Sequence, residues 1–198
     1  MFKGIIKDIG TITDITIHPN SDQIFHIETQ NLSSINKGDS ISCSGVCLTV
    51  VNIMSNVFTV QVSQETMKVS NLNMWKTGKK INLEQAMKLS DRIDGHLVQG
   101  HVDDTAEILT INQNLESHEI RLSCPQELIK FITKKGSVTL DGVSLTVNSV
   151  IDQEFTVNII PYTWKNTTFQ YNKTGNYLNL EVDIIARYLD QLIKYQHN

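Results

Sequence analysis

The chain has few cysteines, and they show no pattern that would form a disulfide framework or a structural zinc site. Cys43, Cys47 and Cys124 are the only three in 198 residues, and no two of them form a CxxC pair. An odd number of thiols without paired spacing is typical of proteins from a reducing compartment. We therefore expect a cytoplasmic protein with no disulfides, no metal site and no bound cofactor.

The chain also lacks a long apolar run and an excess of basic residues. Charged side chains interrupt the first ten residues, MFKGIIKDIG, and no stretch approaches the roughly 18 apolar residues of a membrane helix. The formal net charge is −4 and the pI is about 5.8. These values argue against a nucleic-acid or membrane partner. We interpret the densest basic run, KTGKK at 76–80, as a solvated turn rather than a phosphate site.

What the chain does contain is an internal repeat. The stretch SGVCLTVVNI at 44–53 returns as DGVSLTVNSV at 141–150, an offset of 142 − 45 = 97 residues. The offset holds without a gap from residue 40 to residue 86, with 17 identities in these 47 positions. A repeat of about half the chain predicts two similar domains rather than a solenoid.

Each copy has the pattern of several short strands. Stretches 39–53, 56–63 and 79–86 are rich in β-branched residues, and 137–150, 154–160 and 176–182 repeat the pattern. Gly45 and Gly142 interrupt the first stretch of each copy, which indicates a tight turn, a bulge or the close approach of a ligand. Many short strands in a module of about 95 residues favour a small antiparallel barrel, because closure removes exposed sheet edges.

Two segments have helical patterns. Residues 124–136, CPQELIKFITKKG, begin near a proline, carry apolar residues at helical spacing and end at a glycine. Residues 183–195 form an apolar stripe of Ile184, Ile185, Tyr188, Leu189, Leu192 and Ile193. A terminal helix of this kind either packs on its own domain or forms an oligomer interface, and the pattern leaves both open.

The repeat changes its most reactive side chain. Cys47 in the first copy aligns with Ser144 in the second, whereas Thr49 is repeated as Thr146. Buried cysteine is most often a small apolar residue, but a thiol aligned with a hydroxyl also fits a slot that faces a ligand. Threonine between Leu and Val likewise fits a plain strand or a pocket wall.

His96 and His101 lie in the polar segment 90–108 that joins the two copies. Five residues apart, they would point to opposite faces of an extended strand, which is neither an HExxH helix nor a converging metal pair. They are either turn residues satisfied by backbone groups or proton-transfer residues. The chain has no glycine-rich phosphate loop, GxSxG elbow or nucleotide fingerprint, so an enzyme of this sequence would act on a substrate with little anionic charge.

Six stretches together resemble the riboflavin synthase family of the alpha type. They are MFKGIIKDIG, GVCLTV, ETMKVSNL, DGHLVQGHVD, DGVSLTV and PYTWKNTT, and the likeness covers essentially all 198 residues in order. The resemblance implies an all-β fold of two six-stranded antiparallel Greek-key barrels, at 1–97 and 98–183. It also implies a helix at 184–198 that assembles a homotrimer, with a site between the first barrel of one subunit and the second barrel of its neighbour.

The same resemblance implies an activity. The family converts two molecules of 6,7-dimethyl-8-ribityllumazine into riboflavin and 5-amino-6-(ribitylamino)uracil by moving a four-carbon unit from one to the other, which is the last step of riboflavin biosynthesis. Two binding modules would hold two copies of one compound whose fates differ. Holding the two rings face to face would supply the proximity that the reaction needs.

The ligand contacts implied by the resemblance fall at both barrels. At the first barrel they are Gly4, Ile5, Ile6, Cys47, Leu48, Thr49, Gln61, Val62, Ser63, Gln64, Glu65 and Thr66, with Gly100, His101 and Val102 from the junction. At the second barrel they are Lys135, Ser144, Leu145, Thr146, Asn158, Ile159, Ile160, Pro161, Tyr162 and Thr163. Cys47, His101 and Ser40 are expected to be catalytic, because a thiol can assist addition at an electrophilic carbon and a nearby histidine can move a proton.

Two positions depart from the family pattern. Lys3 replaces the usual threonine of the N-terminal motif, and Ser44 stands where the family often has asparagine. Neither change touches Cys47, Thr49 or His101. The departures bear only on how the N-terminal ligand contacts, Gly4 to Ile6, are oriented.

Other functions are compatible with the same fold. A non-enzymatic lumazine or flavin carrier, like the fluorescent antenna proteins, would tend to keep one good binding barrel, whereas here Gly142, Ser144, Thr146 and Thr163 persist in the second copy. A purely structural pair of barrels leaves the polar junction unexplained. Whether a lumazine synthase shell encloses the protein stays open.

Overall fold

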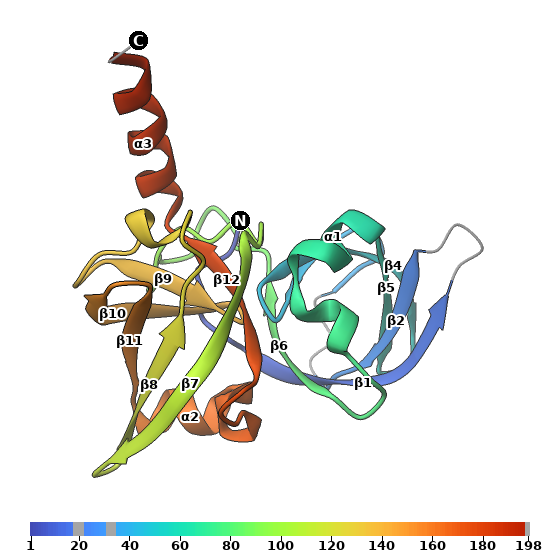
Figure 1. The fold of residues 1–198 in the computed structure, drawn as a ribbon. Helices are drawn as coiled ribbons and strands as arrows, with labels where there is room; N and C mark the ends of the chain where they lie inside the picture. The colour runs from blue at the N-terminus through green and yellow to red at the C-terminus, as the bar shows by residue number, and fades with distance from the viewer. Residues whose placement is uncertain (18–21, 31–34, 197–198) are drawn as a thin grey trace.

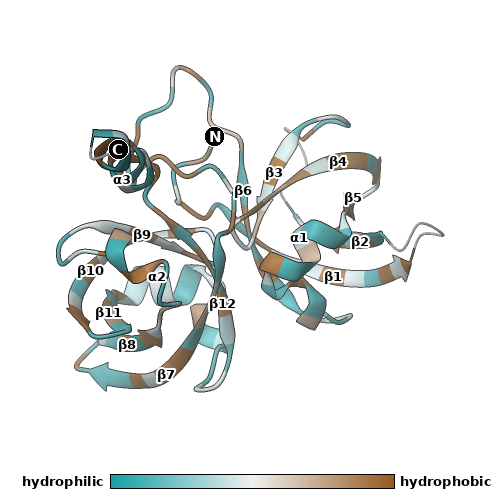
Figure 2. Cartoon of the chain, turned by 45° about the horizontal axis from the view of Figure 1, so that its top comes forward, coloured by the Kyte–Doolittle hydropathy of each residue, from teal (hydrophilic) through white to brown (hydrophobic). Residues whose placement is uncertain are grey.

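Strands with alternating burial make up most of the regular secondary structure, as the sequence predicts. In the computed structural model, which describes residues 1–17, 22–30 and 35–196, twelve strands form two closed antiparallel barrels that lie side by side (Figure 1). Hydrophobic and hydrophilic residues alternate along β1 (Asp8–Ile17), which buries one face of the strand (Figure 2). The predicted fold class, two six-stranded antiparallel barrels with a C-terminal helix, is confirmed.

The first barrel has the strand order β1-β2-β5-β4-β3-β6. After β1, its strands are β2 (Gln23–Glu28), β3 (Ser40–Cys43), β4 (Val46–Met54), β5 (Val57–Val62) and β6 (Lys80–Gln85). Helix α1 (Gln64–Val69) and the 3-10 helix η1 (Asn71–Met74) connect β5 to β6. Its core contains Phe25 and Phe58, and Trp75 meets Phe25 edge-on with ring centroids 5.4 Å apart. Burial of each large side chain contributes about 1.5–3 kcal/mol.

The second barrel repeats this arrangement. Its order is β10-β11-β8-β7-β12-β9, and because the barrel is closed, the same ring read backwards from β7 is β7-β8-β11-β10-β9-β12. Its strands are β7 (Asp104–Asn114), β8 (Ser117–Ser123), β9 (Ser137–Leu140), β10 (Val143–Ile151), β11 (Glu154–Ile159) and β12 (Tyr177–Val182). Helix α2 (Pro161–Asn166) and the 3-10 helix η3 (Thr168–Tyr171) connect β11 to β12, as α1 and η1 do in the first barrel. A separate core surrounds Phe155 and Phe169, so each barrel is stabilised by its own apolar interior.

The helix predicted at 124–136 is wrong. Apart from the short 3-10 helix η2 (Ile129–Phe131), the segment consists of turns. Most of its local hydrogen bonds join residues three apart, such as Leu128 N to Pro125 O at 2.9 Å and Ile132 N to Ile129 O at 3.0 Å, and one, from Ile129 N to Pro125 O at 3.2 Å, joins residues four apart. Both ends of the segment are fixed by β8 and β9, and Leu128 and Ile132 enter the core. These tertiary anchors override the local helical pattern.

The expected ligand contacts from Gln61 to Thr66 do not lie on one strand. β5 ends at Val62, and Ser63 becomes the N-cap of α1, where its side chain accepts a hydrogen bond from the Thr66 backbone N–H at 3.3 Å. Serine is a favoured N-cap residue because its hydroxyl satisfies an otherwise unpaired N–H of the first turn. The helix therefore begins inside the segment for which the sequence predicts ligand contacts.

Helix α3 (Ile184–Gln196) matches the predicted C-terminal helix and extends away from the second barrel (Figure 1). Ion pairs of Lys130 with Asp190, at 2.8 Å, and of Arg187 with Asp103 hold it to that barrel. Most of its apolar stripe is exposed, with 59% of Ile185 and 60% of Leu192 accessible. In the described part of the chain, no helix combines the length and hydropathy needed to cross a membrane.

The two barrels meet through buried asparagines that are related by the repeat. Asn82 donates from Nδ2 to the Asp141 carbonyl oxygen at 2.9 Å, and Asn179 donates to the Ser44 carbonyl oxygen at 2.8 Å. Gly45 and Gly142 lie in turns beside these bonds, and a Cβ added to Gly45 would sit 2.7 Å from Gly142 N. The two glycines therefore form turns at which the barrels approach each other.

Candidate functional site

An outward face of each barrel carries the residues that the repeat singles out. Directly paired residues, and residues two apart on one strand, share a side of a sheet. The pairings of β3 with β4 and of β9 with β10 therefore place two equivalent sets of four side chains together. The first face consists of Ser40, Ser42, Cys47 and Thr49, and the second face of Ser137, Thr139, Ser144 and Thr146.

Each face is covered by a segment from the other half of the chain. The two segments cross at Phe2 and Val98, which form an isolated antiparallel bridge and are fully buried. On the first face, Cys47 N donates to Gly100 O at 2.9 Å. On the second face, Ser144 N donates to Gly4 O at 2.8 Å. The N-terminal segment thus covers the second barrel, and the junction covers the first.

This exchange corrects one prediction. Gly4, Ile5 and Ile6 were expected at the first barrel, but Gly4 lies against Ser144, and Ile6 packs on the core of the second barrel. The expectation fails because sequence adjacency does not reveal that the first residues cross over before β1 begins. Gly100 does lie beside Cys47, and Val102 packs on the first core.

Two repeated glutamates hold the crossing segments in place. Glu181 accepts from Gln99 N at 2.7 Å and from Gly100 N at 2.9 Å, and Glu84 accepts from Lys3 N at 2.9 Å and from Gly4 N at 3.0 Å. Burial raises the pKa of Glu181 to about 7 and also raises the pKa of Glu84, although the backbone N–H groups oppose both shifts.

Glycine is required where each segment touches its face. Gly4 has a φ of 73° and Gly100 a φ of 79°. A Cβ would lie 2.5 Å from the Ser144 Cβ at Gly4 and 2.6 Å from the Cys47 Cβ at Gly100. Both the backbone conformation and the contact exclude other residues.

His96 distinguishes the second face from the first. Its Nδ1 lies 2.7 Å from Ser144 Oγ and its Nε2 lies 3.1 Å from Thr139 Oγ1. The partners of His96 are therefore side chains, and not the backbone groups expected for a turn residue. Burial lowers the pKa of His96, and the charge of Asp183 acts in the opposite direction. A neutral imidazole bonded to a serine hydroxyl can accept a proton.

Sequence reasoning did not place His96 among the site residues. His96 lies outside the gapless repeat of 40–86 with 137–183, so the repeat does not single it out. The expected extended strand between His96 and His101 is also absent, because the bridge at Val98 is the only sheet pairing in 96–103. His101 is exposed and directly follows Gly100 at the first face.

The remaining predicted contacts border the two faces. Val50 pairs with Val60, so Gln61 to Ser63 run alongside Cys47 to Thr49, and α1 then carries Gln64, Glu65 and Thr66. In the second barrel, Val147 pairs with Val157, which brings Asn158 to Ile160 alongside β10 before Pro161, Tyr162 and Thr163 begin α2. Lys135 N donates to Val147 O at 2.8 Å, next to Thr146. Their roles as ligand contacts stay predictions.

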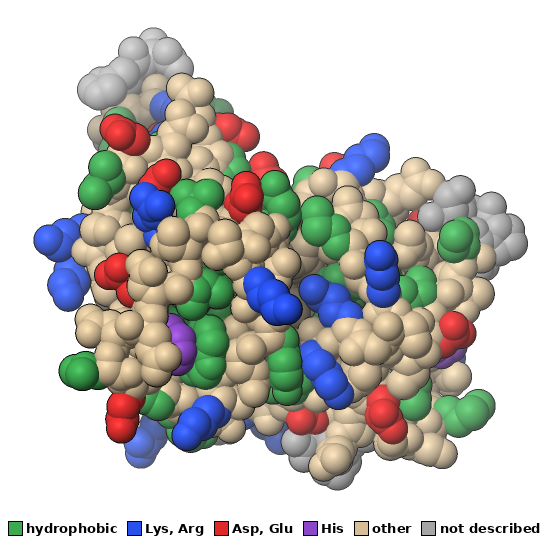
Figure 3. All heavy atoms as spheres, turned by 60° about the horizontal axis from the view of Figure 1, so that its bottom comes forward, with side chains coloured by type: hydrophobic (Ala, Val, Ile, Leu, Met, Phe, Trp, Pro, Cys, Tyr) green, Lys and Arg blue, Asp and Glu red, His purple; other side chains and the backbone are tan. Residues whose placement is uncertain are grey.

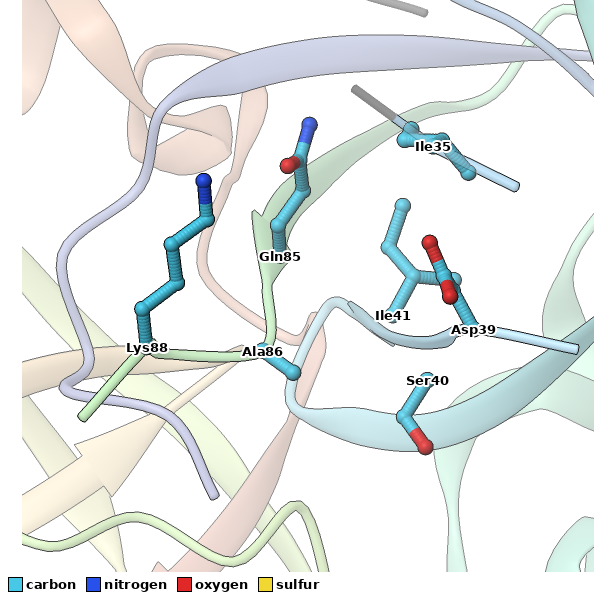
Figure 4. Close-up of a pocket in the computed structure, with 7 residues that line it drawn as sticks. All are labelled: Ile35, Asp39, Ser40, Ile41, Gln85, Ala86 and Lys88. Carbon is cyan, nitrogen blue, oxygen red and sulfur yellow. The ribbon is translucent and has the colours of Figure 1, made fainter.

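Ser40 opens onto a cavity at the edge of the first face. The cavity has a volume of about 180 Å³ and is lined by Ile35, Asp39, Ser40, Ile41, Gln85, Ala86 and Lys88 (Figure 4). Cys47 and Thr49 are not among these residues. The catalytic role expected for Ser40 therefore stays a prediction. Within residues 1–17, 22–30 and 35–196, no three His, Cys, Asp or Glu side chains form a metal-binding group.

Known proteins share both the sequence and the fold. The family described as Lumazine binding domain matches residues 3–86 and again residues 99–183. The riboflavin synthase of Brucella abortus is 44% identical over 202 residues, covering 99% of this chain and all of that protein. The riboflavin synthase of Photobacterium phosphoreum is 40% identical over 194 residues, covering 98% of this chain and 89% of its own.

Among solved structures, LumP complexed with riboflavin has a TM-score of 0.86 and 23% identity, covering 92% of this chain and 99% of that one. At this identity the structural likeness supports the fold alone. The full-length sequence relatives carry the assignment further, because they match both barrels and the segments that cross between them. The chain belongs to the riboflavin synthase family of enzymes and is built from two lumazine binding domains.

Proposed function

We propose that the chain catalyses the dismutation of two molecules of 6,7-dimethyl-8-ribityllumazine. One molecule gives up a four-carbon unit and becomes 5-amino-6-(ribitylamino)uracil, and the other accepts the unit and becomes riboflavin. The two substrates supply every atom of the two products, so no oxidant or reductant is consumed. The observation that carries the proposal is a pair of equivalent faces with one reactive position changed from Cys47 to Ser144.

The composition of the faces fits two copies of one neutral ligand. Thr49 and Thr146 are exposed at equivalent places, beside Ser40 and Ser137 on the neighbouring strands. Hydroxyl groups can both donate to and accept from a ribityl chain, which carries no charge. The adjoining backbone can pair with the alternating donors and acceptors of the pteridine edge.

At the second face, His96 and Ser144 form the proton-accepting pair. The lumazine bound there would lose a proton from its 7-methyl group to His96 through the Ser144 hydroxyl, and the lowered pKa of His96 favours the neutral imidazole that can accept it. Thr139 bonds to the far ring nitrogen and fixes the orientation of the ring. The resulting carbanion is the nucleophile of the bond-forming step.

At the first face, Cys47 assists the acceptor molecule. The carbanion adds to ring carbon 7 of the lumazine held there, where a polarizable thiol can assist addition or its reversal. His101 emerges beside Cys47 and is exposed, so it is available to return the proton. The asymmetry of the faces thereby matches the unequal fates of the two molecules.

The two reacting faces belong to different subunits of a homotrimer in this proposal. Helix α3 supports assembly, because its exposed apolar stripe lies outside both barrel cores and its ion pairs fix only one end of it to the second barrel. Three such helices together would remove their stripes from water. Bringing a first face against a neighbour's second face would enclose both rings in one site.

The direct experiment is to mix the purified chain with 6,7-dimethyl-8-ribityllumazine and follow riboflavin absorbance. Two lumazine molecules should disappear for each riboflavin and each pyrimidine formed. A carrier protein would change the ligand fluorescence without producing riboflavin. Stoichiometric binding with no riboflavin would overturn the proposed reaction and leave the carrier function.

A further inference from the structure

A second cavity lies between the barrels, outside both faces. It has a volume of about 310 Å³ and is lined by Gly78, Lys79, Lys80, Asp141, Thr168, Tyr171, Asn172 and Asn176. Lys79 and Asn176 occupy equivalent positions in the repeat, since 176 − 79 = 97, so the cavity lies near the axis that relates the barrels. The proposed reaction uses none of these residues.

Two polar atoms of the lining residues lack protein partners. Thr168 Oγ1 and Asn172 Nδ2 are buried, and within the described part of the chain neither has a hydrogen-bond partner. Only 5% of Thr168 is exposed. Buried polar groups without partners are rare in native proteins, because burial removes them from water without compensation. Both atoms are hydrogen-bond donors that are closed to solvent in this structure, so a ligand in the cavity would reach them after their side chains turn toward it.

At the equivalent place in the first copy, larger side chains bond to each other. The repeat mates of Thr168 and Asn172 are Asn71 and Trp75. Trp75 Nε1 donates to Asn71 Oδ1 at 2.9 Å, and Asn71 Nδ2 donates to Asp141 Oδ1 at 3.2 Å and to the Tyr177 carbonyl oxygen at 2.9 Å. The second copy has replaced a satisfied pair with two shorter side chains, which leaves both space and unpaired donors.

The charge around the cavity favours an anion. Lys79 is half-buried, and among the described residues no carboxylate lies within ion-pair distance of it, although its charge acts on Asp141 and opposes the rise in pKa that burial causes there. Lys80 lines the wall while donating to Thr11 Oγ1 at 2.7 Å. The one acidic residue, Asp141, already accepts from Asn71 Nδ2 and from Asn179 N at 2.8 Å. Figure 3 shows one face of the molecule, on which Lys and Arg side chains lie near the middle and Asp and Glu side chains are also present.

We propose that this cavity binds a phosphate group, free or carried by a small metabolite. Lys79 supplies the charge, and Thr168 and Asn172 supply neutral hydrogen-bond donors. The KTGKK run is then more than the solvated turn that the sequence indicates, because its fourth residue is held half-buried at a donor-rich wall. The ligand differs from the uncharged ribityl compound of the proposed reaction, so the two proposals stand or fall separately.

The test is calorimetric titration of the full chain with inorganic phosphate and, separately, with ribose 5-phosphate, at constant ionic strength. We expect one saturable site per chain with a Kd of about 1 mM or below. Lys79→Met should weaken binding about tenfold or more. Lys76→Met removes the same charge from the same turn without touching the cavity, and it should leave the Kd unchanged.

A double variant tests the geometry without exposing new apolar surface. Thr168→Asn with Asn172→Trp recreates the filled arrangement of the first copy, and it should abolish phosphate binding while the protein stays folded and retains its lumazine affinity. Tighter binding of ribose 5-phosphate would identify a phosphorylated metabolite, and equal binding would identify the phosphate group alone. The proposal is overturned if neither compound saturates, as expected for a site that holds water only. Equal weakening by Lys76→Met and Lys79→Met would also overturn it, because binding would then be nonspecific.

Discussion

The two barrels have the same strand order and the same outward hydroxyls, yet they differ in what lies against those hydroxyls. At the second face, His96 bonds to Ser144 and Thr139, whereas at the first face Cys47 meets the backbone of Gly100. The difference arises from the segment that joins the barrels, because that segment carries His96. Duplication supplied two similar binding modules, and the single segment between them makes them unequal.

Removal of α3 is expected to have the largest effect, because it would separate a first face from its neighbour's second face. A chain ending at Asp183 should be monomeric by light scattering and should form riboflavin at least about 1000-fold more slowly, since proximity of the two rings is lost. Its barrels should still fold, because no side chain of α3 is buried.

A milder pair of variants controls for the truncation. Leu192→Glu places a charge in the apolar stripe and should also give monomers, whereas Gln191→Glu adds the same charge to the adjacent exposed position and should leave the trimer intact. A truncated chain that remains trimeric would show that the barrels themselves form the interface.

Exchange of the reactive side chains should have the next largest effect. Cys47→Ser should lower turnover about 100-fold while leaving lumazine affinity nearly unchanged, because Ser144 indicates that a hydroxyl fits the equivalent slot. Ser144→Ala removes the hydroxyl of the proposed proton-accepting pair but leaves His96 in place, so it should change affinity at the second face and reduce turnover less than Cys47→Ser does. Steady-state riboflavin formation and equilibrium lumazine binding measure both effects.

The opposite result would reassign the chemistry. If Cys47→Ser matched the wild type in turnover and Ser144→Ala were inactive, the limiting step would lie at the second face. The contact between Ser144 and His96 would then be the main catalytic feature, and Cys47 would be a packing residue.

The repeat allowed the barrels, their duplication and the C-terminal helix to be predicted, because alternating β-branched residues and an apolar helical stripe are local signals. The site was predicted less completely. That Gly4 lies at Ser144 and Gly100 at Cys47 depends on a crossing between Phe2 and Val98, which leaves no periodic signal. The helix expected at 124–136 failed for a related reason, since anchoring at both ends by strands overrode its local pattern.

A first-barrel fragment, residues 1–97, sharpens the comparison by removing the junction segment. The fragment keeps its own N-terminal segment, which in the full chain covers the equivalent second face. Two fragments could therefore cover each other's faces, and we expect a dimer that binds lumazine within about tenfold of the full chain but forms no riboflavin. Light scattering and ligand fluorescence measure the two properties.

Gly4→Ala provides the matched control for the fragment, because its Cβ would collide with the covered face. It should prevent dimerisation without unfolding the barrel. A folded fragment that leaves ligand fluorescence unchanged would refute independent binding by the module, and a Gly4→Ala dimer would refute the exchanged segment.

The smallest expected effect concerns the pair Ser44 and Asp141, which occupy equivalent positions where the barrels meet. Burial raises the pKa of Asp141 from 3.8 to about 6, so the folded state holds this proton more tightly than the unfolded state does. The stabilising contribution is therefore complete below about pH 4 and is lost as the pH rises through about 6.

Asp141→Ser installs the residue of the other copy and removes the titration. Between pH 5 and pH 8, the wild type should lose about 1 kcal/mol of unfolding free energy relative to this variant. Denaturant unfolding at the two pH values measures the difference, with the exposed Asp94→Ser as a control that should follow the wild type. Contributions of His96, Glu84 and Glu181 are common to all three proteins and cancel, so equal pH dependence in the wild type and Asp141→Ser would mean that Asp141 is already ionised in the fold at pH 5.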